Sequence, residues 1–399
     1  MDALMLPSNW QRVRLGDIAE IKRGASPRPI ENPKWFCANS NVGWVRISDI
    51  SKNSRFLYKT AQKLSKKGIE KSRFIKQNSL IMSMCATIGK PIITKIDTCI
   101  HDGFVVFENP KIDLNYLYYF LCYIEKEWLE SGQQGSQVNL NVDLIKNKEV
   151  FYPKDLNEQI AIANILSDVD RYLYTLDALI LKKESVKKAL SFELLSQRKR
   201  LKGFNQAWQR VRLGDICEFG NGGAYETLIV ENGDFKLISL NSIDIDGNLK
   251  NTMKRVNFYD NSLKQDDIVM VLSDVAHGDF LGLCAVIPSN DYVLNQRMGR
   301  LRIRNDCINI LFLRLYINAN QKYFKMQGQG SSQLNLSKKA IEDFEILLPP
   351  LNEQIAIANI LSDVDHEIIS LKNKKRQFEN IKKALNHDLM SAKIRVLKK

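Results

Sequence analysis

The stretch LNEQIAIANILSDVD decides the fold, because it fills residues 156–170 and returns without one change at residues 351–365. A second stretch, WQRVRLGDI, precedes each copy, at residues 10–18 and again at residues 208–216. The two pairs of copies are offset by 195 and 198 residues, respectively. The chain is therefore built as two halves of one plan.

Apolar residues in and after the repeated stretch recur at alternating spacings of four and three, which is the pattern of a coiled-coil seam. The seam positions are Ile162, Leu166, Val169, Leu173, Leu176 and Ile180 in the first half, and Ile357, Leu361, Val364, Ile368 and Leu371 in the second. After a stutter the seam continues through Val186, Leu190 and Leu194, and through Phe378, Ile381, Leu385 and Leu389. The pattern predicts two helices of about 40 residues, each about 60 Å long.

Each helix has a start signal. Asp155 and Glu158 have the spacing of a capping box, and Pro350 precedes the second helix, where proline suits the first turn. Helices this long need a packing partner, and the economical arrangement is an antiparallel pair related by a pseudo-twofold axis. In the alternative arrangement each helix packs only on its own domain, but a narrow apolar stripe favours a helix pair.

The remaining sequence predicts two mixed α/β domains. The first has β-rich runs at residues 44–50, 79–84 and 103–108 and an apolar helix near 114–129. The second repeats this order with runs at 235–240, 268–273 and 301–304 and a helix near 311–326. We therefore expect an α+β protein with a first domain at 1–155, a central helix at 156–203, a second domain at 204–350 and a C-terminal helix at 351–399.

Composition excludes several classes of protein. A hydrophobic content of 44% with 26% charged residues is typical of a folded globular chain, and no apolar run is long enough to span a membrane. The beginning of the chain does not resemble a secretory signal, so a cytoplasmic location is expected. The seven cysteines show no metal-ligand spacing and are expected to be buried free thiols. The net charge of +13 is compatible with a polyanionic partner such as nucleic acid.

The two halves are identical at the helix starts but differ inside the domains. Identical helix starts would present one surface twice, which suits two copies of one partner protein, whereas different domains would bind two different targets. In the alternative interpretation, the identity only preserves helix packing. The candidate partner-binding residues are Asn157, Glu158, Gln159, Asn164 and Asp168 in the first copy and Asn352, Glu353, Gln354, Asn359 and Asp363 in the second.

Over its full length the chain resembles the specificity (S) subunit of type I restriction-modification systems. The resemblance is carried by the proline-preceded LNEQIAIANILSDVD helix starts, the WQRVRLGDI domain starts, and the run Asn295-Gln296-Arg297. It implies two target recognition domains that each read half of a bipartite double-stranded DNA site, and paired helices that set the spacing and dock two modification (methyltransferase) subunits. Those partners would methylate adenine with S-adenosylmethionine, and restriction subunits would add Mg- and ATP-dependent translocation and cleavage. The resemblance implies no cofactor and no metal in this chain.

A search for catalytic motifs supports a non-catalytic subunit. The glycine-rich run at residues 219–223 lacks the spacing of a methyltransferase loop and is expected to form a turn. The sequence Leu348-Pro349-Pro350-Leu351 lacks the polar and aromatic residues of an adenine methyltransferase motif. The four histidines are dispersed. Two alternative functions are a coiled-coil scaffold that binds nucleic acid without sequence preference and a stand-alone restriction or modification enzyme.

Residues that contact DNA should be basic or amide side chains on loops and strand ends, since these reach phosphates and base edges. For each of them the alternative is a solvated surface role. The candidates are Lys22, Arg23, Arg28, Lys34, Lys52, Asn53 and Arg55 in the first domain, and Asn221, Asn241, Ser242, His277, Gln296 and Arg297 in the second.

Overall fold

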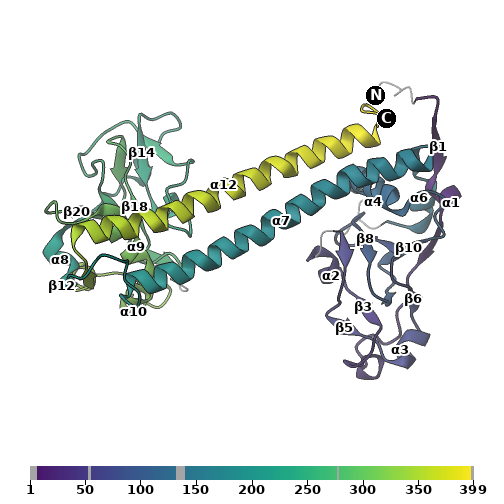
Figure 1. Cartoon of the computed structure of the whole chain (residues 1–399), viewed down its shortest axis with the longest axis horizontal. Coiled ribbons are helices and arrows are strands. Elements are labelled where there is room, and N and C mark those ends of the chain that lie inside the picture. The colour runs from purple at the N-terminus through teal and green to yellow at the C-terminus, as the bar shows by residue number, and fades with distance from the viewer. Residues whose placement is uncertain (1–6, 53–54, 132–139, 276–277, 397–399) are drawn as a thin grey trace. The chain divides into compact units, whose positions relative to one another are not determined.

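The computed structural model describes residues 7–52, 55–131, 140–275 and 278–396. The chain divides into two compact units, Met1–Asp177 with Asn373–Lys399, and Ala178–Lys372. Each unit therefore contains one domain and parts of two long helices, α7 (Leu156–Leu195) and α12 (Leu351–Met390) (Figure 1).

The domain of the first unit is built on three sheets. The largest has the strand order β2 (Glu20–Arg23), β10 (Phe104–Glu108), β7 (Leu80–Ser83), β8 (Pro91–Thr94), β4 (Phe56–Leu57). A second has the order β5 (Gln62–Lys63), β3 (Gly43–Val45), β9 (Thr98–Ile100), β6 (Arg73–Ile75), and β1 (Trp10–Arg14) pairs with β11 (Glu149–Pro153). The short helices are α1 (Leu15–Ile18), α2 (Ile47–Ser51), α3 (Lys66–Glu70), α4 (Leu114–Tyr123), α5 (Glu125–Ser131), α6 (Val142–Asn147) and the 3₁₀ turn η1 (Pro33–Trp35).

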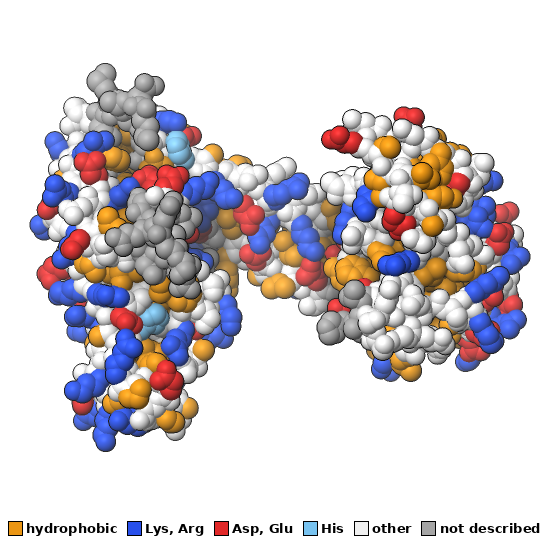
Figure 2. Space-filling model, turned by 180° about the vertical axis from the view of Figure 1, so that it is seen from behind, with side chains coloured by type: hydrophobic (Ala, Val, Ile, Leu, Met, Phe, Trp, Pro, Cys, Tyr) orange, Lys and Arg blue, Asp and Glu red, His pale blue; other side chains and the backbone are white. Residues whose placement is uncertain are grey.

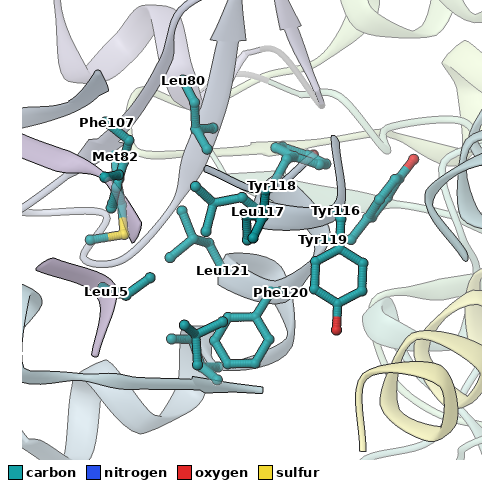
Figure 3. Packing of buried hydrophobic residues seen from close by; sticks show 14 of the residues in the cluster. Leu15, Leu80, Met82, Phe107, Tyr116, Leu117, Tyr118, Tyr119, Phe120 and Leu121 are labelled. Atoms are coloured by element: carbon teal, nitrogen blue, oxygen red, sulfur yellow. The ribbon is translucent and has the colours of Figure 1, made fainter. Parts of the chain in front are cut away.

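Strands β7, β8 and β10 are almost continuously apolar because both faces of their sheet are covered. Leu80 and Met82 belong to the core cluster on one face, whereas Ile81 belongs to the cluster on the other. Figure 3 shows Leu117 and Leu121 of α4 directed toward Leu80 and Met82. The alternation of side chains along a strand thus places successive residues in two separate cores.

The second unit repeats this plan. Its main sheet has the order β13 (Cys217–Asn221), β20 (Met298–Ile303), β16 (Ile268–Val271), β18 (Cys284–Val286), which corresponds to β2, β10, β7 and β8. The other sheets are β15 (Lys254–Val256), β14 (Phe235–Ile238), β19 (Tyr292–Leu294); the pair β12 (Gln209–Arg212), β22 (Glu345–Leu348); and the pair β17 (Ser273–Val275), β21 (Gln333–Asn335). The short helices are α8 (Leu213–Ile216), α9 (Ile310–Ala319), α10 (Gln321–Gln327), α11 (Lys338–Glu342) and the 3₁₀ turns η2 (Glu226–Leu228) and η3 (Leu240–Ser242).

In each unit α7 and α12 pack side by side and run antiparallel. In the first unit Asp170 pairs with Lys382 at 2.5 Å and Asp177 with Lys375 at 2.6 Å. In the second, Lys187 pairs with Asp365 at 2.5 Å and Lys183 with Glu367 at 2.6 Å. Partner numbers fall along α12 as they rise along α7, which is the signature of antiparallel helices. Asp170 and Asp365 occupy the same place in the repeat, so the two units use equivalent ion pairs.

The α+β class with two long helices is confirmed, but several details of the sequence prediction are wrong. The expected strand at 44–50 is β3 followed by α2, and each expected domain helix is two helices, interrupted at Ile124 and at Asn320. In the long helices, Val186 and Ile381 are exposed instead of lying in the seam. Because 3.6 residues per turn drift against a 3.5-residue repeat, the neighbours Lys187 and Lys382 take the inward positions and form the ion pairs.

Both residues of the expected capping box at the start of α7 make hydrogen bonds, but Glu158 also serves the domain. The Asp155 carboxylate accepts a hydrogen bond from the Asn157 backbone N–H at 2.9 Å. Glu158 reaches toward β1, where it accepts from Trp10 Nε1 at 3.4 Å. Tertiary packing therefore uses a residue of the expected capping box.

Candidate nucleic-acid interface

The overall charge does not by itself locate a DNA surface. On the face that Figure 2 shows, Lys and Arg side chains are spread over the surface and mixed with Asp and Glu. A site must therefore be built from local geometry, and both domains offer it where a loop meets the turn before an interior strand of the main sheet, β10 in the first domain and β20 in the second.

In the first domain this region consists of residues 23–28 and 101–103, which we call the first tip. The Gly24 N–H donates to the Phe104 carbonyl at 2.9 Å, and the Ala25 N–H donates to the Ile100 carbonyl at 3.0 Å. A Cβ on Gly24 would lie 2.0 Å from the His101 carbonyl oxygen. Only glycine permits this approach of the two backbones, so Gly24 fixes the loop against the turn.

Arginines gather around the first tip. Arg23 Nε donates to the Asp102 carbonyl at 2.7 Å, the Arg28 guanidinium pairs with the Asp102 carboxylate at 3.1 Å, and Arg73 Nε donates to the Arg23 carbonyl at 3.1 Å. Burial raises the pKa of Asp102, but the hydrogen bond from Ser26 and the charge of Arg28 outweigh it, and the net shift lowers that pKa. The tip thus presents guanidinium groups around one ionised carboxylate, a chemistry suited to phosphates and base edges.

The second domain repeats the arrangement at residues 221–226 and 295–297, the second tip. The Gly222 N–H donates to the Met298 carbonyl at 3.2 Å, the Gly223 N–H donates to the Leu294 carbonyl at 3.0 Å, and a Cβ on Gly222 would lie 2.1 Å from the Asn295 carbonyl oxygen. The glycine-rich run is therefore the end of β13 and a close backbone contact. This agrees with its exclusion as a methyltransferase loop.

Amide side chains replace arginines at the second tip. Glu226 accepts from Asn295 Nδ2 at 2.9 Å and from Gln296 Nε2 at 2.7 Å. Arg297 is exposed and has a left-handed backbone, with φ 68°, which is costly for a residue with a side chain. The carbonyl of Arg297 accepts from the Leu272 N–H at 3.0 Å, so the neighbouring strand holds this conformation.

The structure brings five of the predicted DNA residues together at the tips: Arg23, Arg28, Asn221, Gln296 and Arg297. Four other candidates lie outside the residue ranges that define the tips. Lys22 pairs with Glu20 and Glu108, Lys34 lies over the Trp35 ring, Lys52 follows α2 and Asn241 lies in η3. Asn53 and His277 lie outside the described residues.

Arg55 and Ser242 were wrong choices. Arg55 is 7% exposed and donates to Tyr119, Ser167 and Asn115 at 2.9, 2.6 and 2.7 Å, so it ties α4 to α7 inside the first unit. Ser242 is 2% exposed and donates to the Leu237 carbonyl at 3.3 Å. Both side chains are buried and make hydrogen bonds inside their domains. The sequence around them has no periodic pattern from which this burial could be predicted.

Sequence reasoning missed Asp102 and Glu226, which orient the exposed side chains at the tips. The sequence did contain a signal. If the 198-residue offset of the domain starts is extended beyond the identical residues, it aligns Gly24 with Gly222 and Arg28 with Glu226. The letters differ at the second pair of positions, so only the backbone contacts show that they correspond.

The helix starts divide into buried and exposed residues. Glu353 is fully buried, where it accepts from Arg200 at 2.6 Å and from Trp208 Nε1 at 3.0 Å. Its counterpart Glu158 accepts from Trp10 and from Asn9, which in turn accepts from Arg395 at 2.9 Å. These identical glutamates anchor β1 and the start of β12 to the helices.

The repeated glutamines also serve the domains. Gln159 accepts from the Asp113 backbone N–H at 2.8 Å and donates to the Pro153 carbonyl at 2.8 Å. Gln354 makes the equivalent contacts with Asn309 and Pro349, both at 2.8 Å. The expectation that Gln159, Glu353 and Gln354 bind a partner is therefore corrected, because their side chains are buried and hold each domain on its helix. Glu158 is half-buried and stays a candidate.

The remaining candidate residues of the repeat are exposed in both copies: Asn157, Asn164 and Asp168, and Asn352, Asn359 and Asp363. Large apolar residues of the repeat accompany them at the surface, Leu156 and Ile160 in the first copy and Leu351 and Ile355 in the second. We call each set a repeat face. Exposed leucine and isoleucine beside asparagine and aspartate is a composition that suits a protein interface.

Other features of the chain add no chemistry to these surfaces. Across the described parts of the chain, no group of three or more His, Cys, Asp or Glu side chains is arranged to hold a metal ion. Within the same residues no helix is both long and apolar enough to cross a membrane. All cysteines are free, but Cys37 and Cys307 are exposed, so the expectation of buried thiols is wrong for these two.

Comparisons with known proteins agree with this architecture. The family described as "Type I restriction modification DNA specificity domain" matches residues 7–184 and again residues 205–380. The type I restriction enzyme MjaVIII specificity subunit of Methanocaldococcus jannaschii is 26% identical over 426 residues, which cover 99% of this chain and 95% of the relative. The putative MjaX specificity subunit of the same organism is 24% identical, with 98% and 95% covered.

Solved structures show the same fold. The S subunit of a type I restriction-modification system from M. genitalium aligns with a TM-score of 0.63 at 17% identity, covering 97% of each chain. A chain from a structure of type I R-M complex assembly and conformational transition aligns with a TM-score of 0.60 at 16% identity, covering 96% of this chain and 98% of that one. With the family match spanning both halves, this chain belongs to the DNA specificity subunits of type I restriction-modification systems.

Proposed function

We propose that this chain is the sequence-specific DNA-binding subunit of a type I restriction-modification complex, and that its two domains read the two halves of one bipartite DNA site. The observation that carries the proposal is the pairing of different tips with identical repeat faces. The tips differ in charge and chemistry, as two different half-sites require, whereas the repeat faces offer the same surface twice.

The repeat faces are the proposed docking surfaces for two modification (methyltransferase) subunits. Asn157, Asn164 and Asp168, with their counterparts in the second copy, are exposed and identical, and Asp168 pairs only with Arg171 on the same helix, at 3.4 Å, among the ion pairs of the described residues. The curated relatives are specificity subunits by name, and a structural relative comes from an assembled complex. Restriction subunits would join through the modification subunits.

In this proposal the chain itself is not an enzyme. Methylation with S-adenosylmethionine, and translocation and cleavage with ATP and Mg, belong to the partner subunits. The chain binds the target site and thereby places the DNA at the partner subunits, and it needs no cofactor of its own. The groups at the tips are hydrogen-bond donors and acceptors for base edges and phosphates.

The proposal is tested by methylating a random-sequence DNA library with this chain, its modification subunit and S-adenosylmethionine, beside the chain alone. A two-part motif with an unread gap, seen only with the partner, is the expected result. Methylation by the chain alone would indicate a stand-alone enzyme. Binding without a motif, with a steep dependence on salt, would indicate a scaffold that binds nucleic acid without sequence preference.

A further inference from the structure

We infer that one pair of positions determines base specificity in both domains, Arg28 with Asp102 in the first and Glu226 with Gln296 in the second. Arg28 reads a guanine in one half-site, and Gln296 reads an adenine in the other. The inference rests on the proposed function, and it names the residues that make the two half-sites different.

The correspondence of the two pairs follows from backbone hydrogen bonds. Gly24 donates to Phe104 as Gly222 donates to Met298, and Ala25 donates to Ile100 as Gly223 donates to Leu294. Each glycine lies against the carbonyl of the residue that follows the second acceptor, His101 in the first domain and Asn295 in the second. Four residues after each glycine come Arg28 and Glu226, and one residue after each carbonyl come Asp102 and Gln296.

Side chains at these matched positions meet in both domains, but their chemistry is different. In the first tip a guanidinium contacts a carboxylate at 3.1 Å, and in the second a carboxylate accepts from an amide at 2.7 Å. The two domains keep a side-chain contact at these positions although both residues differ. This indicates that the two domains share the backbone positions and not one particular ion pair. That is the pattern expected of a scaffold that carries exchangeable recognition residues.

Arg28 has the geometry of a guanine reader. Its side chain is 74% exposed, and one terminal nitrogen contacts Asp102. The other guanidinium N–H groups remain able to donate in parallel to O6 and N7 of guanine. Asp102, itself held by Ser26 at 3.0 Å, restricts the arginine before DNA arrives, so less side-chain entropy is lost on binding.

Gln296 has the geometry of an adenine reader. Its Nε2 donates one hydrogen to Glu226, which leaves the second N–H and the Oε1 oxygen available. These two groups match N7, an acceptor, and N6, a donor, on the major-groove edge of adenine. Glu226 is a positioning residue, because an acceptor at this place fixes which end of the amide is nitrogen.

The experiment is selection of random double-stranded DNA by the assembled complex, followed by sequencing of the bound DNA. Arg28→Ala should reduce the preference for one guanine by about 10- to 100-fold, the discrimination expected of one bidentate contact, and leave all other positions unchanged. Arg12→Ala is the matched control, since Arg12, like Arg28, is an exposed arginine of the first domain that pairs with a carboxylate, that of Glu149, but it lies on β1 outside the tip. It should change no position.

The second domain is tested in the same way. Gln296→Ala should reduce the preference for one adenine in the other half-site by about 10- to 100-fold, and Gln209→Ala, an exposed glutamine on β12, should not. Glu226→Ala should weaken the same adenine preference, whereas Glu226→Gln, which keeps an acceptor oxygen, should restore most of it. A purely structural role for Glu226 would lower binding at every position alike.

An exchange variant is the most demanding test. Glu226→Arg combined with Gln296→Asp places the chemistry of the first tip on the second and should convert its adenine preference into a guanine preference. If the wild-type complex selects a two-part motif but Arg28→Ala and Gln296→Ala leave it intact, the inference is overturned and the proposed function stands. If the wild-type complex selects no motif, both are overturned. Arg28→Lys keeps the positive charge but loses the planar two-donor fork, so it should weaken the guanine preference while DNA of unrelated sequence is bound as tightly as by wild type, a result that a folding defect cannot imitate.

Discussion

At the scale of single residues, identical letters in the two repeats do two kinds of work. Glu353 and Gln354 are buried and tie the second domain to α12, while Asn352, one position earlier, is exposed. Sequence comparison within the chain could not separate these roles, because burial depends on neighbours contributed by remote segments such as Trp208 and Asn309.

Replacing Gln354 tests the anchoring role. Gln354→Ala leaves the Asn309 N–H and the Pro349 carbonyl without their partner, which should cost about 1–3 kcal/mol of stability. Urea denaturation of the full chain, with hydrogen exchange at the start of α9, measures this loss. Asn352→Ala should change stability by less than about 0.5 kcal/mol and weaken docking of the modification subunit instead. If Asn352→Ala lowered stability and Gln354→Ala weakened only docking, the division of the repeat into anchoring and partner-binding residues would be contradicted.

His101 should make the first tip sensitive to acid. Burial lowers its pKa, Asp102 opposes this by raising it, and Arg46 lowers it further; the net pKa lies below the ordinary 6.5. Nδ1 of this histidine accepts from the Gly103 N–H at 2.9 Å, which requires the unprotonated nitrogen. The unfolded chain therefore binds the proton more readily than the folded one, and stability falls as pH drops below about 6.5.

Hydrogen exchange of β9 and β10 between pH 7 and pH 5 measures this effect, after correction for the intrinsic pH dependence of exchange. His101→Asn introduces the residue that the second tip carries at the same place, Asn295, and should remove the additional acid-dependent opening. An unchanged pH dependence in the variant would show that another group is responsible.

At the scale of secondary-structure elements, the starts of α7 and α12 and much of their apolar seam were predicted well because a helix start and a heptad are local signals. The expected ends at 203 and 399 were wrong, because the helices end at Leu195 and Met390. The domains were harder to predict. The run at residues 44–50 is rich in aromatic and β-branched residues, as strands are, yet Asp49 accepts from the Arg46 N–H at 2.9 Å and favours the short helix α2. The strand pairings that align Gly24 with Gly222 join segments about 80 residues apart, and no sequence period records them.

The helix seam can be tested in each unit separately. Leu166 and Leu361 are equivalent and fully buried, so Leu166→Ala and Leu361→Ala should each cost about 2–5 kcal/mol. Leu181→Ala, at an exposed site on α7, should cost less than about 0.5 kcal/mol. Local hydrogen exchange should place the first loss in the first unit and the second loss in the second unit. If all three variants lost the same stability, Leu166 and Leu361 would not be seam positions.

Helix length should set the gap of the DNA site. Adding one heptad to the middle of both α7 and α12 keeps the seam in register and lengthens each helix by about 10 Å, the length of about three base pairs. Methylome sequencing should then show unchanged half-sites with about three more base pairs between them. A motif with the original gap would show that the helices do not act as the spacer.

At the scale of the whole molecule, two domains with separate cores and separate tips should be exchangeable. Replacing residues 1–155 with the corresponding domain of another specificity subunit should change one half-site completely and leave the other unchanged. The resulting complex should retain methylation activity because both repeat faces remain. A change in both half-sites would show that the domains do not read DNA independently.

The contact between Arg395 and Asn9 in the first unit corresponds to a contact of Arg200 in the second. Arg395 lies 195 residues after Arg200, and each arginine closes the end of one long helix against the beginning of a domain, through Asn9 in one unit and directly on Glu353 in the other. What the second unit achieves with a continuous stretch of chain, the first achieves with side chains, because Arg395 and Glu158 both contact Asn9. In the first unit these side chains therefore do the work of a connecting peptide.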